Sequence, residues 1–478
     1  MGSLLGKGLP RGLALALLVV LAGCAAERKP DLARLYQGWA IQSEGRRPVI
    51  VIPGMLGTRL KDPSLGQIIW GTMKGFLGGD VASKLALNID SAEPNRLETA
   101  GLVEEVGGVD IYGGILKVLE QMGGYAPECP DTPNRRATYF VFPYDWRHSS
   151  ATNAAGLERE IQRIKALYGD PNLQVDIVAH SMGGLIVRYY LLYGARDVRG
   201  EAHPEPDFAG AQNVNTVVLL GTPSLGSVAA LHACIEGNRV GLTPMPPEVL
   251  ATLPSMYELM PSPSVPVLYG ADGHPVAMDL YDVRSWRRME WGIFDPQLAA
   301  GIRSRYALHH PAAGVDDGDR YLERLRKTFG SLLQQASGFH RALEAAAIPG
   351  GVKIVLMGGD CTPTPRAFLV ERDGDREVVR FSPDRVKHPP KGADLWQLYF
   401  EPGDGTVTKS SLMGAISRPK GHGGEVLTLF PYASPIFLCE RHTKLVRNPT
   451  FQDNLLQALL FEPISPGEAC RLPTVQSH

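Results

Sequence analysis

One ten-residue segment, Val175–Gly184, constrains the fold of this chain more than any other part of the sequence. An apolar strand leads into Ser181, and a helical pattern follows at once. This order is typical of a nucleophile elbow, a tight strand-to-helix turn that exposes one hydroxyl at the end of a sheet. The turn is so crowded that only small residues fit two positions either side of the serine, where Ala179 and Gly183 stand. We predict that Ser181 is a nucleophile, and the alternative is a serine in an incidental turn.

Apolar, β-branched segments alternate with helical patterns along the chain. The predicted strands cover residues 48–53, 139–142, 175–178, 214–220, 352–357 and 426–430. Apolar residues at helical spacing predict a helix around Leu157–Leu167, and a second helix follows the serine at Leu185–Leu192. Such alternation predicts an α/β fold with a mostly parallel central sheet flanked by helices.

The first residues are predicted to be a targeting signal rather than part of the fold. Positive residues precede an apolar run of eleven residues, Gly12–Ala22. A membrane-spanning helix needs roughly 20 such residues, so this run suits a secretory signal better. The run ends in Leu21-Ala22-Gly23-Cys24, which resembles the processing box of bacterial lipoproteins.

That resemblance implies that residues 1–23 are a signal peptide and that Cys24 becomes acylated. Residues 24–46 would then be a tether, and two or three acyl chains would anchor the protein to a membrane. The next residue is Ala25 rather than Asp, which favours the outer membrane of a bacterial cell envelope. The alternative is an ordinary cleaved signal that releases a periplasmic or secreted protein.

Charge and cysteine content exclude some functions. The formal net charge of −2 and the pI near 6.6 argue against nucleic acid as a partner and against electrostatic attachment to anionic lipid. No CxxC pair occurs, so a zinc site is not predicted. The chemistry expected of Ser181 requires no metal, and no cofactor is predicted. After Cys24 an odd number of cysteines remains, so at least one is unpaired, and the sequence leaves the pairing open among Cys129, Cys234, Cys361, Cys439 and Cys470.

Two irregular segments interrupt the α/β pattern. Proline-rich residues 228–348 are predicted to form a cap, or lid, inserted over the site between a first core part at 47–227 and a second at 349–478. Residues 66–125 form the other insertion. Its apolar side chains are candidates for contact with lipid, and a satellite core is the alternative for each of them: Trp70, Met73, Phe76 and Leu77.

A serine nucleophile needs a histidine base, and in an elbow enzyme the chain order is serine, acid, histidine. Four later histidines are candidates: His340, His388, His422 and His442. His442 follows the last predicted strand, 426–430, and precedes a helical pattern, so its loop is expected over the nucleophile. His422 precedes that strand and should lie at the opposite end of the sheet.

The acid and the oxyanion donors have candidates too. Asp404 stands between two glycines, whereas Asp360 directly follows a strand, and sequence order alone does not separate them. The oxyanion of the intermediate needs two backbone N–H groups. We expect these from Met182, which follows the nucleophile, and from Met55, in the loop after the first strand.

Several motifs occur in the same order as in the lecithin:cholesterol acyltransferase-like proteins, and the resemblance covers roughly residues 47–462. They are Val51–Leu60, Pro143–Arg147, Ala179–Gly184, Gly221–Gly226, Pro363–Arg366 and Gly403–Val407. The resemblance implies an α/β-hydrolase fold and an acyl-enzyme route on glycerophospholipids or other ester lipids. It also implies Asp404 as the acid and His442 as the base for Ser181, with Met55 and Met182 at the oxyanion hole. Animal members often carry a disulfide near the lid, and no close cysteine pair after residue 47 obviously matches it.

The leading hypothesis is therefore a membrane-anchored lipid acyl hydrolase or acyltransferase, with an alcohol as possible acceptor. The alternatives are a carboxylesterase for non-lipid esters and a non-catalytic envelope binding protein. Asp145 and Arg147 are expected to fix a strand end by charge-assisted hydrogen bonds. His180 is expected to serve in packing, because the residue before the nucleophile points away from it in most elbows.

Overall fold

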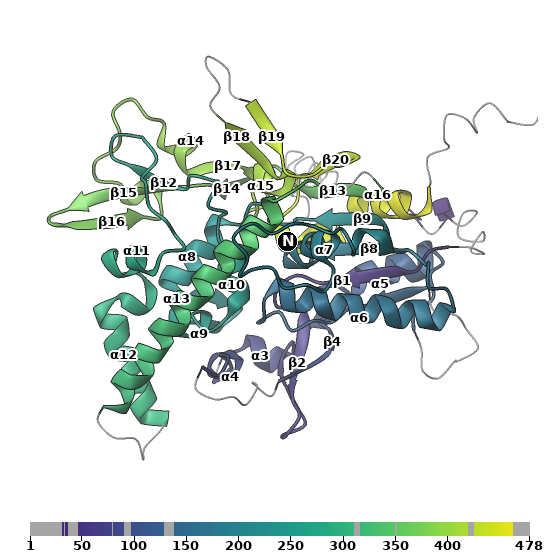
Figure 1. Cartoon of the computed structure of the whole chain (residues 1–478), viewed down its shortest axis with the longest axis horizontal. Helices are drawn as coiled ribbons and strands as arrows, with labels where there is room; N and C mark the ends of the chain where they lie inside the picture. Colours follow the sequence, from purple (N-terminus) through teal and green to yellow (C-terminus); the bar gives the residue numbers. More distant parts are fainter. Residues whose placement is uncertain are drawn as a thin grey trace, which may run out of the picture.

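A parallel sheet forms the centre of the molecule. The computed structural model describes residues 31–32, 34–36, 46–78, 80–89, 97–128, 138–309, 316–348, 351–418 and 425–461. Within these residues, six strands pair side by side in the order β20-β13-β9-β8-β1-β7, all parallel (Figure 1). Their bounds are β1 Val49–Ile52, β7 Tyr139–Val141, β8 Val175–His180, β9 Val214–Leu220, β13 Lys353–Gly359 and β20 Ser434–Leu438.

Both faces of this sheet are buried because its strands are apolar on both sides. Ile50 and Ile177 belong to one hydrophobic core, which includes α6 (Ser150–Tyr168) and α7 (Met182–Tyr193). Val51 and Val178, one position along each strand, belong to a second core, formed with α5 (Gly113–Lys117) and α16 (Pro449–Leu460). This alternation follows from the period of two along a strand. The predicted parallel sheet flanked by helices is thus confirmed.

The last strand of the sheet is not the one predicted. The 426–430 segment contributes β19 (Glu425–Thr428), which pairs only with β18 (Ala415–Arg418) in a separate antiparallel hairpin. The sixth sheet strand is β20, which contains Pro435 and therefore lacks one backbone donor. Proline is tolerated there because β20 is an edge strand, paired with β13 alone.

Residues 66–125 are more regular than expected. The chain forms an antiparallel sheet from β2 (Thr58–Asp62), β3 (Gln67–Trp70) and β4 (Glu98–Leu102). Trp70 is fully buried against Phe76 and Trp146, so it belongs to the core rather than to a lipid-facing surface. Met73 and Leu77 are exposed. The other elements here are α3 Met73–Phe76, α4 Val81–Leu85, β5 Glu105–Val106, β6 Val109–Asp110 and a π-helical turn, η1, Val118–Met122.

Residues 228–348 form mostly helices. Figure 1 shows α11, α12 and one end of α13 projecting to the left of the sheet. The other end of α13 packs on α7, so this segment shares a continuous core with one face of the sheet. Whether it acts as a cap stays a prediction. Its elements are α8 Val228–Glu236, β10 Asn238–Val240, β11 Thr243–Met245, α9 Pro247–Leu250, α10 Pro254–Glu258, β12 Leu268–Gly270, α11 Val283–Arg288, η3 Gly292–Phe294, α12 Pro296–His309 and α13 Asp317–Glu344.

Short elements between β13 and β20 carry the remaining candidate residues. Among them, β14 (Thr362–Pro365) and β17 (Phe400–Gly403) form a two-stranded antiparallel sheet. Parallel to β12 lies β15 (Phe368–Asp373), which pairs in turn with β16 (Arg376–Arg380). The other elements between β13 and β20 are η4 Pro383–Arg385, α14 Leu395–Tyr399 and α15 Lys409–Met413. Elsewhere in the chain, η2 (Ala211–Asn213) precedes β9 and η5 (His442–Arg447) follows β20.

Candidate active site

Ser181 lies in the turn between β8 and α7, near the middle of the sheet. Its φ of 53° and ψ of −123° are unusual for a residue with a side chain, and they mark the sharp reversal of an elbow. A Cβ at Gly183 would lie 2.5 Å from the Pro53 carbonyl oxygen, and one at Gly184 would lie 2.0 Å from Thr222 Oγ1. Small residues are therefore required here by direct contact with the neighbouring strands.

The structure brings the three sequence-predicted side chains together. His442 Nε2 lies 2.9 Å from Ser181 Oγ, and His442 Nδ1 lies 2.7 Å from Asp404 Oδ2. The backbone N–H of His442 also donates to the Asp404 carbonyl oxygen at 2.9 Å. Each ring nitrogen of His442 therefore has one partner, which fixes the plane of the imidazole between the hydroxyl and the carboxylate.

Asp404 is only 2 % exposed, yet its surroundings favour the charged form. Its second oxygen, Oδ1, accepts hydrogen bonds from the backbone N–H groups of Thr406 at 2.9 Å and Val407 at 2.7 Å. Burial alone would raise the pKa of this carboxyl. The charge of His442 and these hydrogen bonds outweigh burial and lower the pKa below its usual value. A carboxylate is thus held facing the imidazole.

The competing candidates lie elsewhere. Asp360 pairs with Lys409 at 3.1 Å and makes no hydrogen bond to His442 among the described residues. His340 is buried in α13, where burial lowers its pKa to about 3. His388 contributes only its backbone N–H, which donates to Glu371. His422 lies outside the described residues, as do Cys24, Cys129 and Cys470.

The loop that carries Met55 lies against the nucleophile. A Cβ at Gly54 would stand 2.9 Å from the Cβ of Ser181, so this glycine allows the backbone to approach. Met182 opens α7, and the first amides of a helix have no partner within the helix. The oxyanion hole formed by the N–H groups of Met55 and Met182 stays a prediction, which the closeness of Gly54 to Ser181 and the position of Met182 at the start of α7 support.

Two buried tyrosines hold this loop: Tyr112, which no sequence motif marked, and Tyr144, which belongs to the Pro143–Arg147 motif but was assigned no role. The Tyr112 hydroxyl accepts the Gly54 N–H at 2.8 Å and lies 2.7 Å from His180 Nδ1. The Tyr144 hydroxyl donates to the Pro53 carbonyl oxygen at 3.0 Å. His180 therefore does more than pack, because it takes part in a hydrogen-bonded chain that ends at the oxyanion loop. Burial lowers the pKa of His180 to about 3, so it is neutral.

The Pro143–Arg147 motif is stabilised locally. Arg147 is fully buried and donates to Asp145 through Nε at 2.9 Å and Nη2 at 2.7 Å, a two-point charge-assisted pair. Asp145 also accepts the backbone N–H of Arg147. The charge-assisted hydrogen bonds expected of these two residues are present, and they join the two side chains to each other, while a role in fixing the strand end stays a prediction.

A disulfide joins the acid and base regions. Cys361, which follows β13, is bonded to Cys439, three residues before His442. Cys234 is a buried free thiol. The sequence left this pairing open, although one cysteine directly after a predicted strand and one shortly before the predicted base were a signal for it.

A parallel sheet with a serine elbow at the end of an inner strand, and a histidine and an aspartate brought to it from later loops, defines the α/β-hydrolase fold. Residues 105–284 match the family model of lecithin:cholesterol acyltransferase, which confirms the resemblance seen in the motifs. The match includes the elbow and the Pro143–Arg147 motif.

Known proteins extend this likeness. The lysosomal phospholipase A and acyltransferase of Rattus norvegicus is 23% identical over 278 residues, which are 57% of this chain and 51% of the relative. The chain thus matches about half the length of that curated relative. Among solved structures, the Tle4-Tli4 complex contains a chain of similar fold, with a TM-score of 0.54 and 15% identity, over 87% of this chain and 98% of that one.

Neither a cluster of metal-ligating side chains nor a membrane-spanning helix occurs within the described ranges. There, no group of three or more histidine, cysteine, aspartate or glutamate side chains is placed to hold a metal ion. No helix among the same residues has the length and apolar character needed to cross a bilayer.

Proposed function

We propose that this chain is a serine-dependent acyl hydrolase or acyltransferase that acts on ester lipids such as glycerophospholipids. The observation that carries the proposal is the continuous contact from Ser181 Oγ through His442 to Asp404, at 2.9 and 2.7 Å. The similarity to lecithin:cholesterol acyltransferase and to a phospholipase A and acyltransferase supports lipid esters as the substrate class.

In the proposed reaction, His442 Nε2 takes the proton of Ser181 as the Oγ attacks the ester carbonyl carbon. Asp404 orients the imidazole and stabilises its positive charge. The N–H groups of Met55 and Met182 bind the oxyanion, and each such donor is worth about 2.7–4 kcal/mol in known enzymes. The leaving alcohol takes the proton from His442. Water or a second alcohol then attacks the acyl-enzyme, with His442 again as the base.

The test is incubation of the purified chain with labelled phosphatidylcholine, with and without a long-chain alcohol, and with Ser181→Ala as the control. A new ester made only by the active chain would establish a transferase, and free fatty acid alone would establish a lipase. Turnover only of short, water-soluble esters would favour the carboxylesterase alternative. Full turnover by Ser181→Ala, or no covalent labelling by a fluorophosphonate, would contradict the serine mechanism.

We also propose that Cys24 is acylated and holds the protein at a bacterial envelope membrane, on the strength of the Leu21–Cys24 motif. Growth with labelled palmitate should label the wild-type chain and leave Cys24→Ala unlabelled. Membrane fractionation of the two chains would then show whether the outer membrane is the destination. A chain without label that is released into the periplasm would instead support an ordinary signal peptide.

A further inference from the structure

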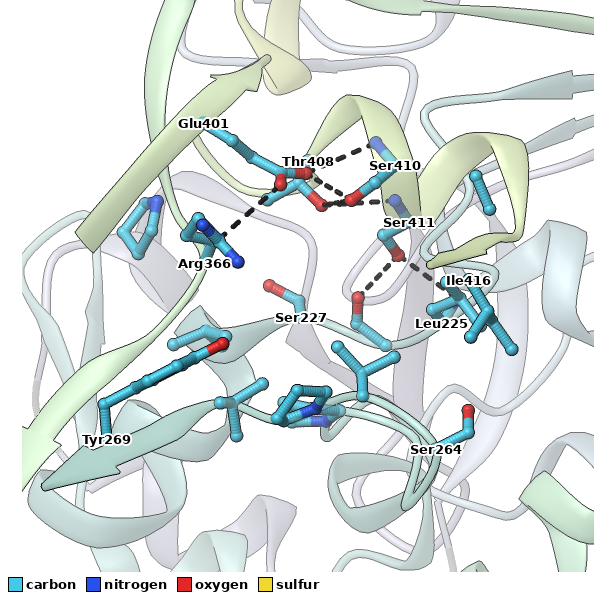
Figure 2. A pocket seen from close by; sticks show the side chains of 18 residues that line it. Leu225, Ser227, Ser264, Tyr269, Arg366, Glu401, Thr408, Ser410, Ser411 and Ile416 are labelled. Atoms are coloured by element: carbon cyan, nitrogen blue, oxygen red, sulfur yellow. Dashed lines mark hydrogen bonds and ion pairs between the residues drawn. The ribbon is translucent and has the colours of Figure 1, made fainter. Parts of the chain in front are cut away.

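A cavity of about 240 Å³ lies beside the loop that carries Asp404 (Figure 2). We call it the acid-loop pocket. None of Ser181, Asp404 and His442 lines it. Its walls come from separate parts of the chain, at residues 225–228, 261–269, 365–366 and 401–416. It is therefore a concave site that lies close to the candidate catalytic residues but does not include them.

The pocket shares a wall with the acid loop. Ser227, which lines the pocket, donates its hydroxyl hydrogen to the Thr406 carbonyl oxygen at 2.6 Å. The N–H of Thr406 in turn donates to Asp404 Oδ1. A molecule that contacts Ser227 would thus be linked to the Asp404 carboxylate, which orients His442, through the two hydrogen bonds of Thr406.

The wall next to β14 and β17 carries two charged residues, Arg366 and Glu401, and the guanidinium of Arg366 has an unused donor (Figure 2). Arg366 is 39 % exposed in its side chain and lies 3.8 Å from Glu401 through Nε. Its Nη1 donates to the Gln397 carbonyl oxygen at 3.3 Å, and its Nη2 has no partner within the described part of the chain. Glu401 also accepts hydrogen bonds from the hydroxyl and the backbone N–H of Ser410. The guanidinium therefore keeps a free edge for an anion.

A second donor faces the same space. In Figure 2 the hydroxyl of Tyr269 points toward the pocket from the side opposite Ser410. This hydroxyl has no hydrogen-bond partner among the residues that the structure describes. The rest of the lining holds no further cation and combines serine and threonine side chains with apolar ones, which include Leu225, Val228, Pro261, Val265, Pro266, Val267 and Ile416.

We propose that the acid-loop pocket binds an anionic amphiphile, whose acid group is held by Arg366 and Tyr269 and whose chain packs on the apolar walls. Carboxylates and phosphates both suit a guanidinium edge, so a fatty acid and an alkyl phosphate are the two sources of this chemistry. A fatty acid would be a product of the reaction proposed above, and this part of the inference rests on that proposed function. Binding itself does not depend on it.

Calorimetric titration tests the proposal with the full chain carrying Cys24→Ser, which avoids acylation and detergent. Decanoate and decyl phosphate are the anionic probes, while decanol and inorganic phosphate supply the chain and the head group alone. We expect one or both anionic probes to bind and neither control probe to bind comparably. Arg366→Gln should weaken the anion affinity about tenfold or more. Lys409→Gln removes a neighbouring charge outside the pocket and should leave affinity unchanged.

The same titration after reaction with an alkyl fluorophosphonate separates the pocket from the catalytic cleft. Binding that survives the block and depends on Arg366 supports the pocket. Equal affinity of Arg366→Gln and wild type, or loss of all binding after the block, overturns it. If Ser181 does not react with the reagent, the proposed function fails, yet the comparison of Arg366→Gln with Lys409→Gln still decides the pocket. Preference for decanoate over decyl phosphate identifies the fatty acid as the source.

Discussion

The nucleophile and its two partners are held in place by different means. Ser181 stands on one continuous stretch of chain, Val175–Tyr193, in which a buried strand turns into a buried helix. Asp404 and His442 are 38 residues apart, in the turn after β17 and at the start of the 3-10 helix η5, and a disulfide connects their surroundings. The nucleophile is therefore fixed by local packing, whereas the acid and the base are fixed by contacts between distant segments.

This difference indicates which parts of the site tolerate substitution and which do not. Larger side chains near Ser181 would collide with residues that closely follow the neighbouring strands β1 and β9. Changes near Asp404 and His442 act instead on a few hydrogen bonds and one covalent bond. Overpacking at the elbow should thus lower stability, whereas loss of a hydrogen bond on the acid–base side should lower mainly activity, and loss of the disulfide should lower both.

The largest effect is expected from Asp404→Asn. The variant keeps the shape of the acid but loses the charge that stabilises the imidazolium, and such a change lowers kcat about 10⁴-fold in a comparable triad. Steady-state kinetics on a labelled phospholipid would measure it. Asp360→Asn is the matched control and should stay within about twofold, because Asp360 pairs with Lys409 rather than with His442. Equal losses in both variants would show that the acid is misassigned.

Removal of the disulfide should come next. Cys361→Ser with Cys439→Ser opens a loop of 78 residues, and the loss of such a bridge costs about 2–4 kcal/mol of unfolding free energy. Because the bridge lies close to both His442 and Asp404, kcat should also fall about ten- to a hundredfold through misplacement of the base.

Chemical denaturation and kinetics would be measured on the same preparation of this double variant. Cys234→Ala, at the buried free thiol, keeps the bridge and should retain kcat. A double variant with lowered stability but unchanged kcat would show that the bridge does not position the base.

A smaller effect is expected at the elbow from Gly184→Ala. The new methyl group would lie 2.0 Å from Thr222 Oγ1, and overpacking of this kind costs about 1–3 kcal/mol. Thermal unfolding would show a lowered Tm, and Thr222→Ala in the same chain should restore part of it by removing the colliding atoms. Gly301→Ala, in the helix α12, is the control and should be neutral or slightly stabilising. A normal Tm for Gly184→Ala would mean that the elbow is less rigid than its contacts indicate.

The smallest effect is a pH dependence of stability. The lowered pKa of Asp404 means that the folded chain binds its proton less tightly than the unfolded chain does. Its contribution to stability is therefore present above the unfolded pKa of about 3.9 and is lost as the pH falls through the lower folded value. Denaturation of the wild type and Asp404→Asn from pH 6 downward should give a difference in unfolding free energy that shrinks below about pH 4. A difference that is constant with pH would argue against a stabilised carboxylate.

The sequence predicted well what depends on local pattern. The elbow, the parallel sheet and the order of the strands up to β13 follow from apolar periodicity and small residues near Ser181. The prediction of the last sheet strand was wrong. Pro435 makes the β20 segment look unlike a strand, and the nearby 426–430 segment has a stronger strand pattern. The pairing of Cys361 with Cys439 also depends on positions that only the folded chain defines.

The support of the oxyanion loop was beyond sequence reasoning for the same reason. Tyr112 and Tyr144 come from separate loops, and each hydroxyl makes a hydrogen bond to the backbone near Gly54. No motif marks Tyr112, and the motif that contains Tyr144 does not reveal its contact with a distant main chain. The three candidate catalytic residues, in contrast, could be proposed because chain order and family resemblance restrict the choice.

The bridge between Cys361 and Cys439 links the site to the chemistry of the compartment around it. Disulfides form and persist where thiols are oxidised, and glutathione keeps them reduced in the bacterial cytosol. In a reducing compartment this bond does not form, so the segments that carry Asp404 and His442 lack their covalent link. If the chain is exported as proposed, completion of its site is tied to oxidation outside the compartment in which it is made.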